Sequence, residues 1–199
     1  MKILIIGGTG TIGKKVVAHF SEQHEVLVAG RTTDLNVDIA ASDSIEELFK
    51  KVGAVDAIIC AAGDAKWAKF QHLSESDFFI GLRSKLMGQV NLVRIGRQYL
   101  SPGGSITLTT GILADDPVAL TTSAAMVNGA IHSFVKAVQL EIENGIRINV
   151  VSSGMVEDAA EKYGTYFPGH NPIPMDKVVN GYVRSVLGKG SGEVIRIYD

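Results

Sequence analysis

The 199-residue sequence contains a single cysteine, Cys60, so it cannot form an internal disulfide or a cysteine-based metal cluster. No apolar run approaches the roughly 18 residues that a membrane-spanning helix needs, and the first, residues 3–6, is too short for a signal peptide. Charge is nearly balanced, with 19 basic and 21 acidic residues, so no basic surface for nucleic acid is expected. No group of His, Asp and Glu has the spacing of a metal site. The sequence therefore predicts a cytoplasmic protein without a metal, a membrane or a nucleic-acid partner.

Short β-branched runs alternate along the chain with longer helical patterns. Strands are expected at residues 3–6, 25–29, 35–39, 55–60, 105–110, 146–151 and 193–197, and helices at 11–20, 44–52, 74–100, 122–144 and 176–187. Ser44 with Glu47, and Ser74 with Asp77, have the spacing that starts a helix. Continuous apolar strands separated by helices are typical of a parallel sheet covered on both faces. The chain is predicted to form one α/β domain over residues 1–199, a doubly wound, Rossmann-like fold with about seven strands.

Glycine is over-represented, with 22 residues, and three glycines fall between the first strand and the first helix. Gly7 permits a tight turn, Gly10 removes a Cβ where a pyrophosphate must touch backbone, and Gly13 lets the helix pack close to the sheet. The start of that helix offers unpaired N–H groups to phosphate. The predicted contacts of a dinucleotide are Gly7, Thr9, Gly10, Thr11, Ile12 and Gly13. The alternative is a tight turn with no ligand.

The end of the second predicted strand indicates which dinucleotide binds. A strand of this kind in an NAD site usually ends in an acidic residue that holds the ribose 2′-hydroxyl. Here it ends in Gly30 and Arg31, followed by Thr32. A guanidinium can form a fork of hydrogen bonds to a 2′-phosphate. NADP(H) is therefore expected in preference to NAD(H), although Arg31 could also be a solvated surface residue.

Several segments, in order and spacing, resemble the short-chain dehydrogenase/reductase family over nearly the whole chain. Asp38-Ile39 resembles the family's adenine-contacting aspartate segment, and Cys60-Ala61-Ala62-Gly63 resembles its Asn-Asn-Ala-Gly motif. Residues 145–154 resemble the sixth strand and its Pro-Gly ending, of which Gly154 is kept. The resemblance implies that Met155 and Val156, which follow, line the nicotinamide side of a bound coenzyme.

The family's catalytic Ser, Tyr and Lys are missing from this chain. Alignment of the second long helix places Gly111 at the serine position, Ala124 at the tyrosine position and Asn128 at the lysine position. Lys85 stands where the family has its catalytic asparagine. The two changes resemble a reciprocal exchange, so our hypothesis is that the Lys85 ammonium lies near the nicotinamide ribose. The alternative is a solvated lysine, with Asn128 as a hydrogen-bonding group between helices.

Other groups could deliver a proton in place of the tyrosine. Thr110, at the end of the fifth strand, joins Lys85 and Asn128 as a candidate catalytic residue. Residues 153–175 resemble the family's substrate loop, and their Tyr163, Tyr166 and His170 are expected to pack over the pocket more readily than to act in catalysis. His132 is expected to be structural or at a subunit contact. Trp67 is expected to be a surface anchor.

Three functions remain open at this stage. The first is an NADP(H)-dependent oxidoreductase for a small carbonyl or alcohol substrate, with a rearranged active site. Loss of a general acid slows such a reaction by ~10²–10⁴-fold without forbidding it. The second is a catalytically inactive NADP(H)-binding sensor or scaffold protein, and the third is a lyase or isomerase that uses the nucleotide structurally. The family's pairing of its two long helices between subunits implies a homodimer or homotetramer.

Overall fold

The computed structural model describes residues 1–198, and this part of the chain holds one seven-stranded sheet. Its order is β3-β2-β1-β4-β5-β6-β7, and all neighbouring strands run parallel. The strands are β1 (Lys2–Ile6), β2 (Glu25–Gly30), β3 (Leu35–Asn36), β4 (Val55–Cys60), β5 (Leu100–Gly111), β6 (Arg147–Ser153) and β7 (Val194–Ile197). The strand order reverses between β1 and β4, which is the arrangement of a doubly wound fold. The predicted fold class is confirmed.

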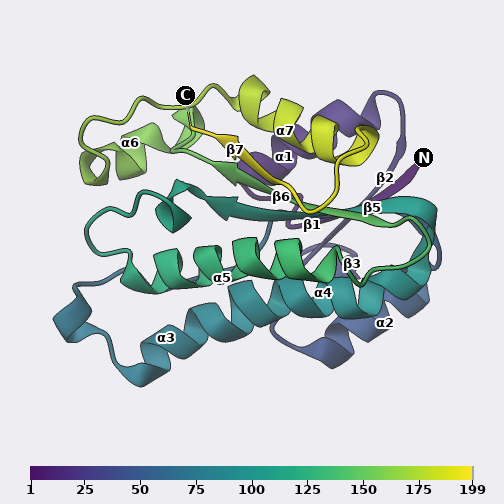
Figure 1. Ribbon diagram of the computed structural model, residues 1–199, viewed down its shortest axis with the longest axis horizontal. Helices are drawn as coiled ribbons and strands as arrows, with labels where there is room; N and C mark the ends of the chain where they lie inside the picture. Colours follow the sequence, from purple (N-terminus) through teal and green to yellow (C-terminus); the bar gives the residue numbers. More distant parts are fainter. Residues whose placement is uncertain (199) are drawn as a thin grey trace.

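Helices cover both faces of this sheet (Figure 1). On one face lie α2 (Ser42–Val52), α3 (Glu75–Gly81), α4 (Gly88–Gly96) and α5 (Thr122–Val138). On the other lie α1 (Thr11–Ser21) and α7 (Met175–Leu187), and α6 (Ala160–Tyr163) lies in the segment between β6 and α7. Short 3₁₀ turns complete the connections: η1 (Phe70–His72), η3 (Arg97–Tyr99), η4 (Ile112–Ala114), η5 (Glu157–Ala159) and η6 (Gly164–Tyr166).

The helix predicted over residues 74–100 is present, but it changes type along its length. Ser74 and Asp77 do form a capping box before α3, but a π-helical turn, η2 (Leu82–Met87), separates α3 from α4. A glycine flanks this wider turn on each side, Gly81 at the end of α3 and Gly88 at the start of α4. Because neither has a side chain, α3 packs closely on α5 and α4 packs closely on the Ile39 segment. A Cβ on Gly81 would lie 3.3 Å from the Val127 side chain, and a Cβ on Gly88 would lie 3.0 Å from the Ile39 carbonyl oxygen. The helix thus packs closely on α5 before η2 and on Ile39 after it, and the extra residue of the π turn lies between these two contacts.

Two other helix boundaries differ from the predictions. No side chain of residues 1–198 caps α2, which begins at Ser42; the Ser44 hydroxyl accepts instead from the Asp38 backbone N–H at 3.0 Å, so the capping box predicted there is wrong. The helix predicted to reach residue 144 ends at Val138. The chain then passes through turns to Asn144 and Gly145, both with positive φ, before β6 starts.

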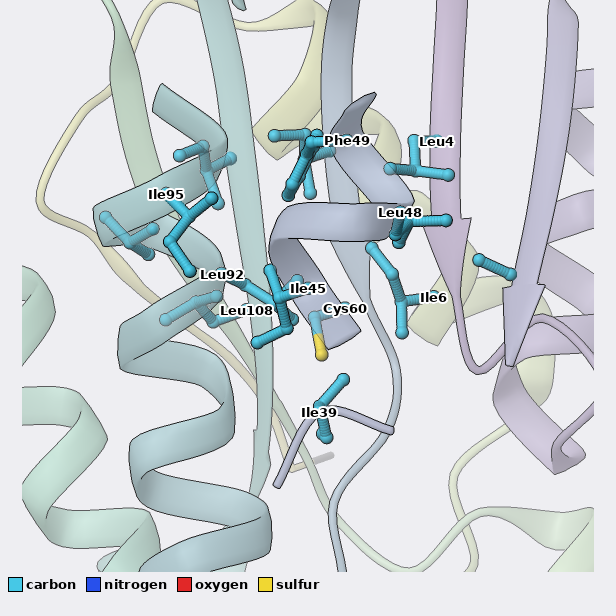
Figure 2. Packing of buried hydrophobic residues seen from close by; sticks show 14 of the residues in the cluster. Leu4, Ile6, Ile39, Ile45, Leu48, Phe49, Cys60, Leu92, Ile95 and Leu108 are labelled. Carbon is cyan, nitrogen blue, oxygen red and sulfur yellow. The ribbon is translucent and has the colours of Figure 1, made fainter. Parts of the chain in front are cut away.

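Two apolar layers hold the sheet in place. On one face, Leu4 and Ile6 of β1 pack with Ile45 and Leu48 of α2 and with residues of α4 (Figure 2). On the other, Ile3, Ile5 and other strand residues pack with Val16 and Phe20 of α1 and with Tyr182 of α7. Both layers run the length of β1, β4 and their neighbours, so the carboxyl ends of these strands lie in fixed positions at one edge of the sheet.

Candidate functional site

A cavity of about 340 Å³ opens at the carboxyl ends of β1, β2 and β4. Ligands bind at this reversal point in doubly wound sheets. Ten of the residues predicted to bind coenzyme line it: Gly7, Thr9, Gly10, Arg31, Thr32, Asp38, Ile39, Ala61, Ala62 and Gly63. Five lining residues are absent from that prediction: Ile6, Gly30, Val37, Asp64 and Ser84. Seven predicted residues are not among those that line it: Thr11, Ile12, Gly13, Lys85, Gly154, Met155 and Val156.

The glycine-rich turn forms the floor of this cavity. Gly7 has φ +82°, and a Cβ there would lie 2.8 Å from the carbonyl of Ala61. A Cβ on Gly13 would overlap the Gly7 carbonyl oxygen, so α1 starts closer to β1 than any other residue would allow. Gly10 differs, because a Cβ there would meet only the Gly7 oxygen, at 3.4 Å. Gly7 and Gly13 are therefore required by the close packing of backbone around the turn, whereas the lack of a side chain at Gly10 leaves space in the cavity.

The amino terminus of α1 faces this turn without a cap. Its N-cap is Gly10, no side chain in the described part of the chain caps it, and no acidic residue lies in its first turn. The first N–H groups of a helix carry a partial positive charge and attract phosphate. Thr11, Ile12 and Gly13 supply these N–H groups. A cavity with Gly7 and Gly10 on its floor, open beside an uncapped helix start, fits the diphosphate of a dinucleotide.

Two oppositely charged side chains stand on facing walls of the cavity. Arg31 follows β2, Asp64 follows β4, and an Arg31 Nη2 atom lies 3.5 Å from Asp64 Oδ2. Both are well exposed, with 74% and 64% of the side-chain surface accessible. The Asp64 backbone N–H donates to the hydroxyl of Ser84, in η2, at 3.1 Å. The sequence offered one signal for Asp64, its place directly after Gly63.

The Asp38-Ile39 segment closes the side of the cavity beyond β3. The Asp38 carboxylate accepts from the Ala40 N–H at 3.0 Å, which fixes a turn at the start of the path to α2. Ile39 is buried in the core beneath it, against Gly88. Both line the cavity, and their contact with an adenine ring stays a prediction.

Lys85 lies in η2, directly beside the cavity wall. Its Cα and Cγ would each be 2.9 Å from a Cβ on Gly63, so the lysine backbone and stem pack against Gly63 in the loop after β4. Desolvation by burial lowers the pKa of the Lys85 ammonium, and the nearby Cys60 and Asp64 act in the opposite direction. The same burial raises the pKa of the Cys60 thiol to about 11. Lys85 is therefore a half-buried lysine whose stem packs beside the cavity, and the choice between a coenzyme-binding and a solvated ammonium stays a prediction.

The face of α5 that lies against the sheet carries Ala124, Asn128 and His132, one helical turn apart. Asn128 is 4% exposed, and its Nδ2 would be 4.0 Å from a Cβ on Gly111. Its Oδ1 atom is buried and has no hydrogen-bond partner within residues 1–198. A buried amide oxygen without a partner costs stability. Gly111 and Asn128, at the family's serine and lysine positions, thus lie next to each other, and the Asn128 side chain leaves an unused acceptor there.

Thr110 and His132 form a buried pair behind this point. The Thr110 hydroxyl lies 2.8 Å from His132 Nε2. Burial lowers the pKa of His132, while the carboxylate of Asp115 opposes that shift. Asp115 is itself held by two hydrogen bonds from Arg196, of 2.8 and 3.1 Å, and its pKa is lowered to about 2 chiefly by them. His132 therefore has a hydrogen-bond partner inside this chain, Thr110, which fits a structural role for this residue.

Aromatic residues from two loops meet over the same end of the sheet. Trp67 lies between β4 and η1, and its ring centroid is 5.4 Å from that of Tyr163 and 5.9 Å from that of Tyr166. Trp67 and Phe167 belong to an apolar cluster that includes Ala124 and Met155. Trp67 is thus a half-buried residue of an aromatic cluster that joins two loops, and its expected role as a surface anchor stays a prediction. Val156 pairs with Ile173 in an isolated bridge that ties the two ends of the 153–175 segment.

Two kinds of feature are absent from the part of the chain that the structure describes. Residues 1–198 contain no group of three or more His, Cys, Asp or Glu that could hold a metal ion. No helix among them combines the length and the apolar character needed to cross a membrane.

Comparison with known proteins places this site in a family. The profile of the enoyl-(acyl carrier protein) reductase family matches residues 4–172. The chain is 42% identical to the Listeria innocua protein lin1944, with all of both chains covered and a TM-score of 0.98. It is 28% identical to a small-chain dehydrogenase crystallised with NADPH, with 99% of this chain and 96% of the other covered and a TM-score of 0.88.

A curated relative is more distant. Glucose and ribitol dehydrogenase homolog 2 from Arabidopsis thaliana is 24% identical over 162 residues, which are 76% of this chain and 56% of the relative. The chain spans about half the length of the curated relatives it matches. The matched profile, the sheet order and the glycine-rich turn agree, and the chain belongs to the short-chain dehydrogenase/reductase family of oxidoreductases.

Proposed function

We propose that the protein is an NADP(H)-dependent reductase of a small carbonyl compound, or the corresponding alcohol dehydrogenase, with a rearranged active site. The observation that carries this proposal is the cavity at the β1–β4 reversal, which combines an uncapped helix start with Arg31 at the end of β2. The likeness to a dehydrogenase crystallised with NADPH supports it. The residues proposed to hold the coenzyme are those that line the cavity, together with Thr11, Ile12, Gly13, Lys85, Gly154, Met155 and Val156.

Arg31 is the residue proposed to select NADP(H) over NAD(H). The end of β2 carries no carboxylate that could accept from a ribose 2′-hydroxyl, and a 2′-phosphate offers three oxygens to the guanidinium. Thr32 adds a hydroxyl beside it, and Gly30 leaves room because a Cβ there would meet nothing closer than 3.8 Å. Arg31→Gln is expected to weaken NADPH binding and to leave NADH binding nearly unchanged.

Lys85 is proposed to supply the positive charge of the family's missing lysine, and Asn128 to supply the amide of its missing asparagine. Bound coenzyme supplies a hydride to a carbonyl carbon. The Lys85 ammonium, desolvated beside Gly63, hydrogen-bonds to the ribose and places positive charge near the carbonyl oxygen as negative charge develops there. The unused Oδ1 of Asn128 accepts a hydrogen bond from the Lys85 ammonium or from a water beside it.

The substrate proposed for this site has a reactive carbonyl and an uncharged, apolar body. Ala124 and Met155 belong to the apolar cluster that Trp67 and Phe167 cover, and residues 153–175 are proposed to be the substrate loop. The proton reaches the product oxygen from water or from Thr110, whose hydroxyl is polarised by His132. A reactive carbonyl is proposed because neither Ala124 nor Gly111 has a side chain that can donate a proton.

A sensor or scaffold without turnover is the second candidate, and one observation favours it. The positions of the family's tyrosine and serine hold Ala124 and Gly111, and the hydroxyl of Thr110, the candidate proton donor, is already paired with His132. Anaerobic incubation with NADPH and a panel of aldehydes, ketones and quinones tests the choice by the absorbance of reduced nicotinamide. Turnover supports the reductase, whereas tight NADPH binding without turnover of any compound supports the sensor.

We also propose that the chain is a single coenzyme-binding domain that assembles as a dimer or tetramer through α3, η2 and α5. These elements expose Phe79, Ile80, Met87 and Met126, each more than 40% accessible. Light scattering on the purified protein tests this, and the double variant Ile80→Glu with Met126→Glu is expected to yield monomers. The cytoplasmic location expected from the sequence stays a prediction.

A further inference from the structure

The Arg31–Asp64 ion pair crosses the mouth of the proposed coenzyme site. The two residues follow β2 and β4, the strands on either side of β1 in the sheet. Both line the same cavity, and their charged atoms are 3.5 Å apart. The pair thus joins opposite walls of the cavity above the glycine-rich floor.

Asp64 is held in place to make this contact. Its backbone N–H donates to the Ser84 hydroxyl, and it follows Gly63, whose φ of +129° only glycine adopts readily. The carboxylate also acts on the Lys85 ammonium, whose pKa it raises against the effect of burial. Asp64 therefore acts on both of the cations that are assigned above to the coenzyme, Arg31 and Lys85.

We infer that Asp64 is a specificity-determining residue, which holds Arg31 across the cavity until a 2′-phosphate displaces it. This inference rests on the proposed function, because it takes Arg31 as the 2′-phosphate ligand. A nucleotide with a 2′-phosphate offers Arg31 a dianion in place of one carboxylate, so Arg31 leaves Asp64. A nucleotide with a free 2′-hydroxyl offers no such partner, and the Arg31–Asp64 pair persists.

Asp64 therefore lowers the affinity for every anionic nucleotide by its charge, and lowers the affinity for 2′-phosphorylated ones further by competing for Arg31. The second effect is small, because an exposed ion pair contributes little. Asp64→Asn is expected to tighten the binding of adenosine 2′,5′-bisphosphate by about two- to five-fold beyond its effect on 5′-AMP. The gain disappears when Arg31 is also replaced.

The test is a double-mutant cycle measured by calorimetry on the whole protein. Dissociation constants for adenosine 2′,5′-bisphosphate and 5′-AMP are determined for the wild type, Asp64→Asn, Arg31→Gln and the double variant, and no turnover is required. Asp34→Asn removes an equal charge from an exposed position outside the cavity lining and serves as the matched control. The inference predicts that Asp64→Asn raises the bisphosphate/AMP affinity ratio only when Arg31 is present, and that Asp34→Asn leaves the ratio unchanged.

Two results would overturn the inference and leave the proposed function standing. One is an unchanged affinity ratio in Asp64→Asn, and the other is an equal rise with and without Arg31, since either shows that the two side chains do not compete. A different result overturns both: a wild type that binds neither nucleotide nor NADPH, or an Arg31→Gln variant that keeps the wild-type ratio.

Discussion

Replacement of Lys85 by methionine separates a coenzyme-binding lysine from a structural one, because the two roles predict opposite signs. A hydrogen bond from an ammonium group to the coenzyme contributes about 1.5–3 kcal/mol. Its loss is expected to raise the Kd for NADPH by roughly ten- to one-hundredfold. Methionine keeps the length of the stem that packs against Gly63, so this contact is retained.

The same replacement is expected to stabilise the free protein. Burial lowers the pKa of Lys85 from its ordinary value of 10.5, so the folded state binds a proton less readily than the unfolded chain. The cost of burying the ammonium is fully present below the folded-state pKa and disappears as the pH rises past 10.5. At pH 7 the methionine variant avoids that cost, and its melting temperature is expected to exceed that of the wild type.

Fluorescence titration with NADPH and thermal unfolding without nucleotide measure the two effects. Lys69→Met, at an exposed position outside the cavity lining, is the control and is expected to change neither. An unchanged Kd together with a lower melting temperature in Lys85→Met would show that the lysine is structural, and the proposed site would lose its central cation.

Two further predictions concern the cavity floor and the buried histidine. Gly10→Ala is expected to lower the free energy of unfolding by less than about 1 kcal/mol, because the new Cβ meets only one atom, at 3.4 Å. The same Cβ fills the hollow, so NADPH binding is expected to weaken more than tenfold. Urea unfolding measures the stability and calorimetry the affinity, and an unchanged affinity for NADPH would contradict the prediction. Burial lowers the pKa of His132 in the folded state below its ordinary value of 6.5, so its contribution to stability is complete above pH 6.5 and is lost as the pH falls through the folded-state value. Urea unfolding between pH 8 and pH 5 is expected to show a smaller loss of stability in His132→Gln than in the wild type. Equal losses of stability in both proteins would show that His132 is not a buried, neutral imidazole.

The sequence was sufficient to predict the sheet and the glycine-rich turn, because both depend on local patterns. The apolar runs that became β1, β4 and β6 are buried along nearly their whole length, and Gly7, Gly10 and Gly13 lie where a strand meets a helix. The helix boundaries were predicted less well. The π turn at η2 and the early start of β5 depend on contacts with distant residues, such as Val127 on α5 and Val55 on β4, which no local pattern encodes.

In the candidate site, too, residues within local motifs were predicted and residues placed by distant contacts were missed. Ten cavity residues were predicted from motifs, whereas Asp64 and Ser84 were missed because their position depends on how η2 packs against the end of β4. The Thr110–His132 pair was missed for a similar reason. Each residue alone has an ordinary interpretation, and only the register of α5 against β5 brings them within 2.8 Å. The exchange of Lys85 and Asn128 was visible in the sequence, but its environment was not.

The exchange of Lys85 and Asn128 predicts that the two positions are energetically coupled. η2 lies against α5, and Asn128 is buried there with an unused acceptor. Asn128→Lys alone would bury a second ammonium beside the first, and an unpaired buried charge costs about 3–5 kcal/mol. Lys85→Asn removes the first ammonium, so the double variant is expected to recover at least 1 kcal/mol relative to the sum of the single variants, which lies within the range found for neighbouring residues. Urea unfolding of all four proteins measures this coupling. If the two changes were strictly additive, the ammonium groups would occupy separate spaces, and the lysine at position 85 would not replace the one that the family carries on α5.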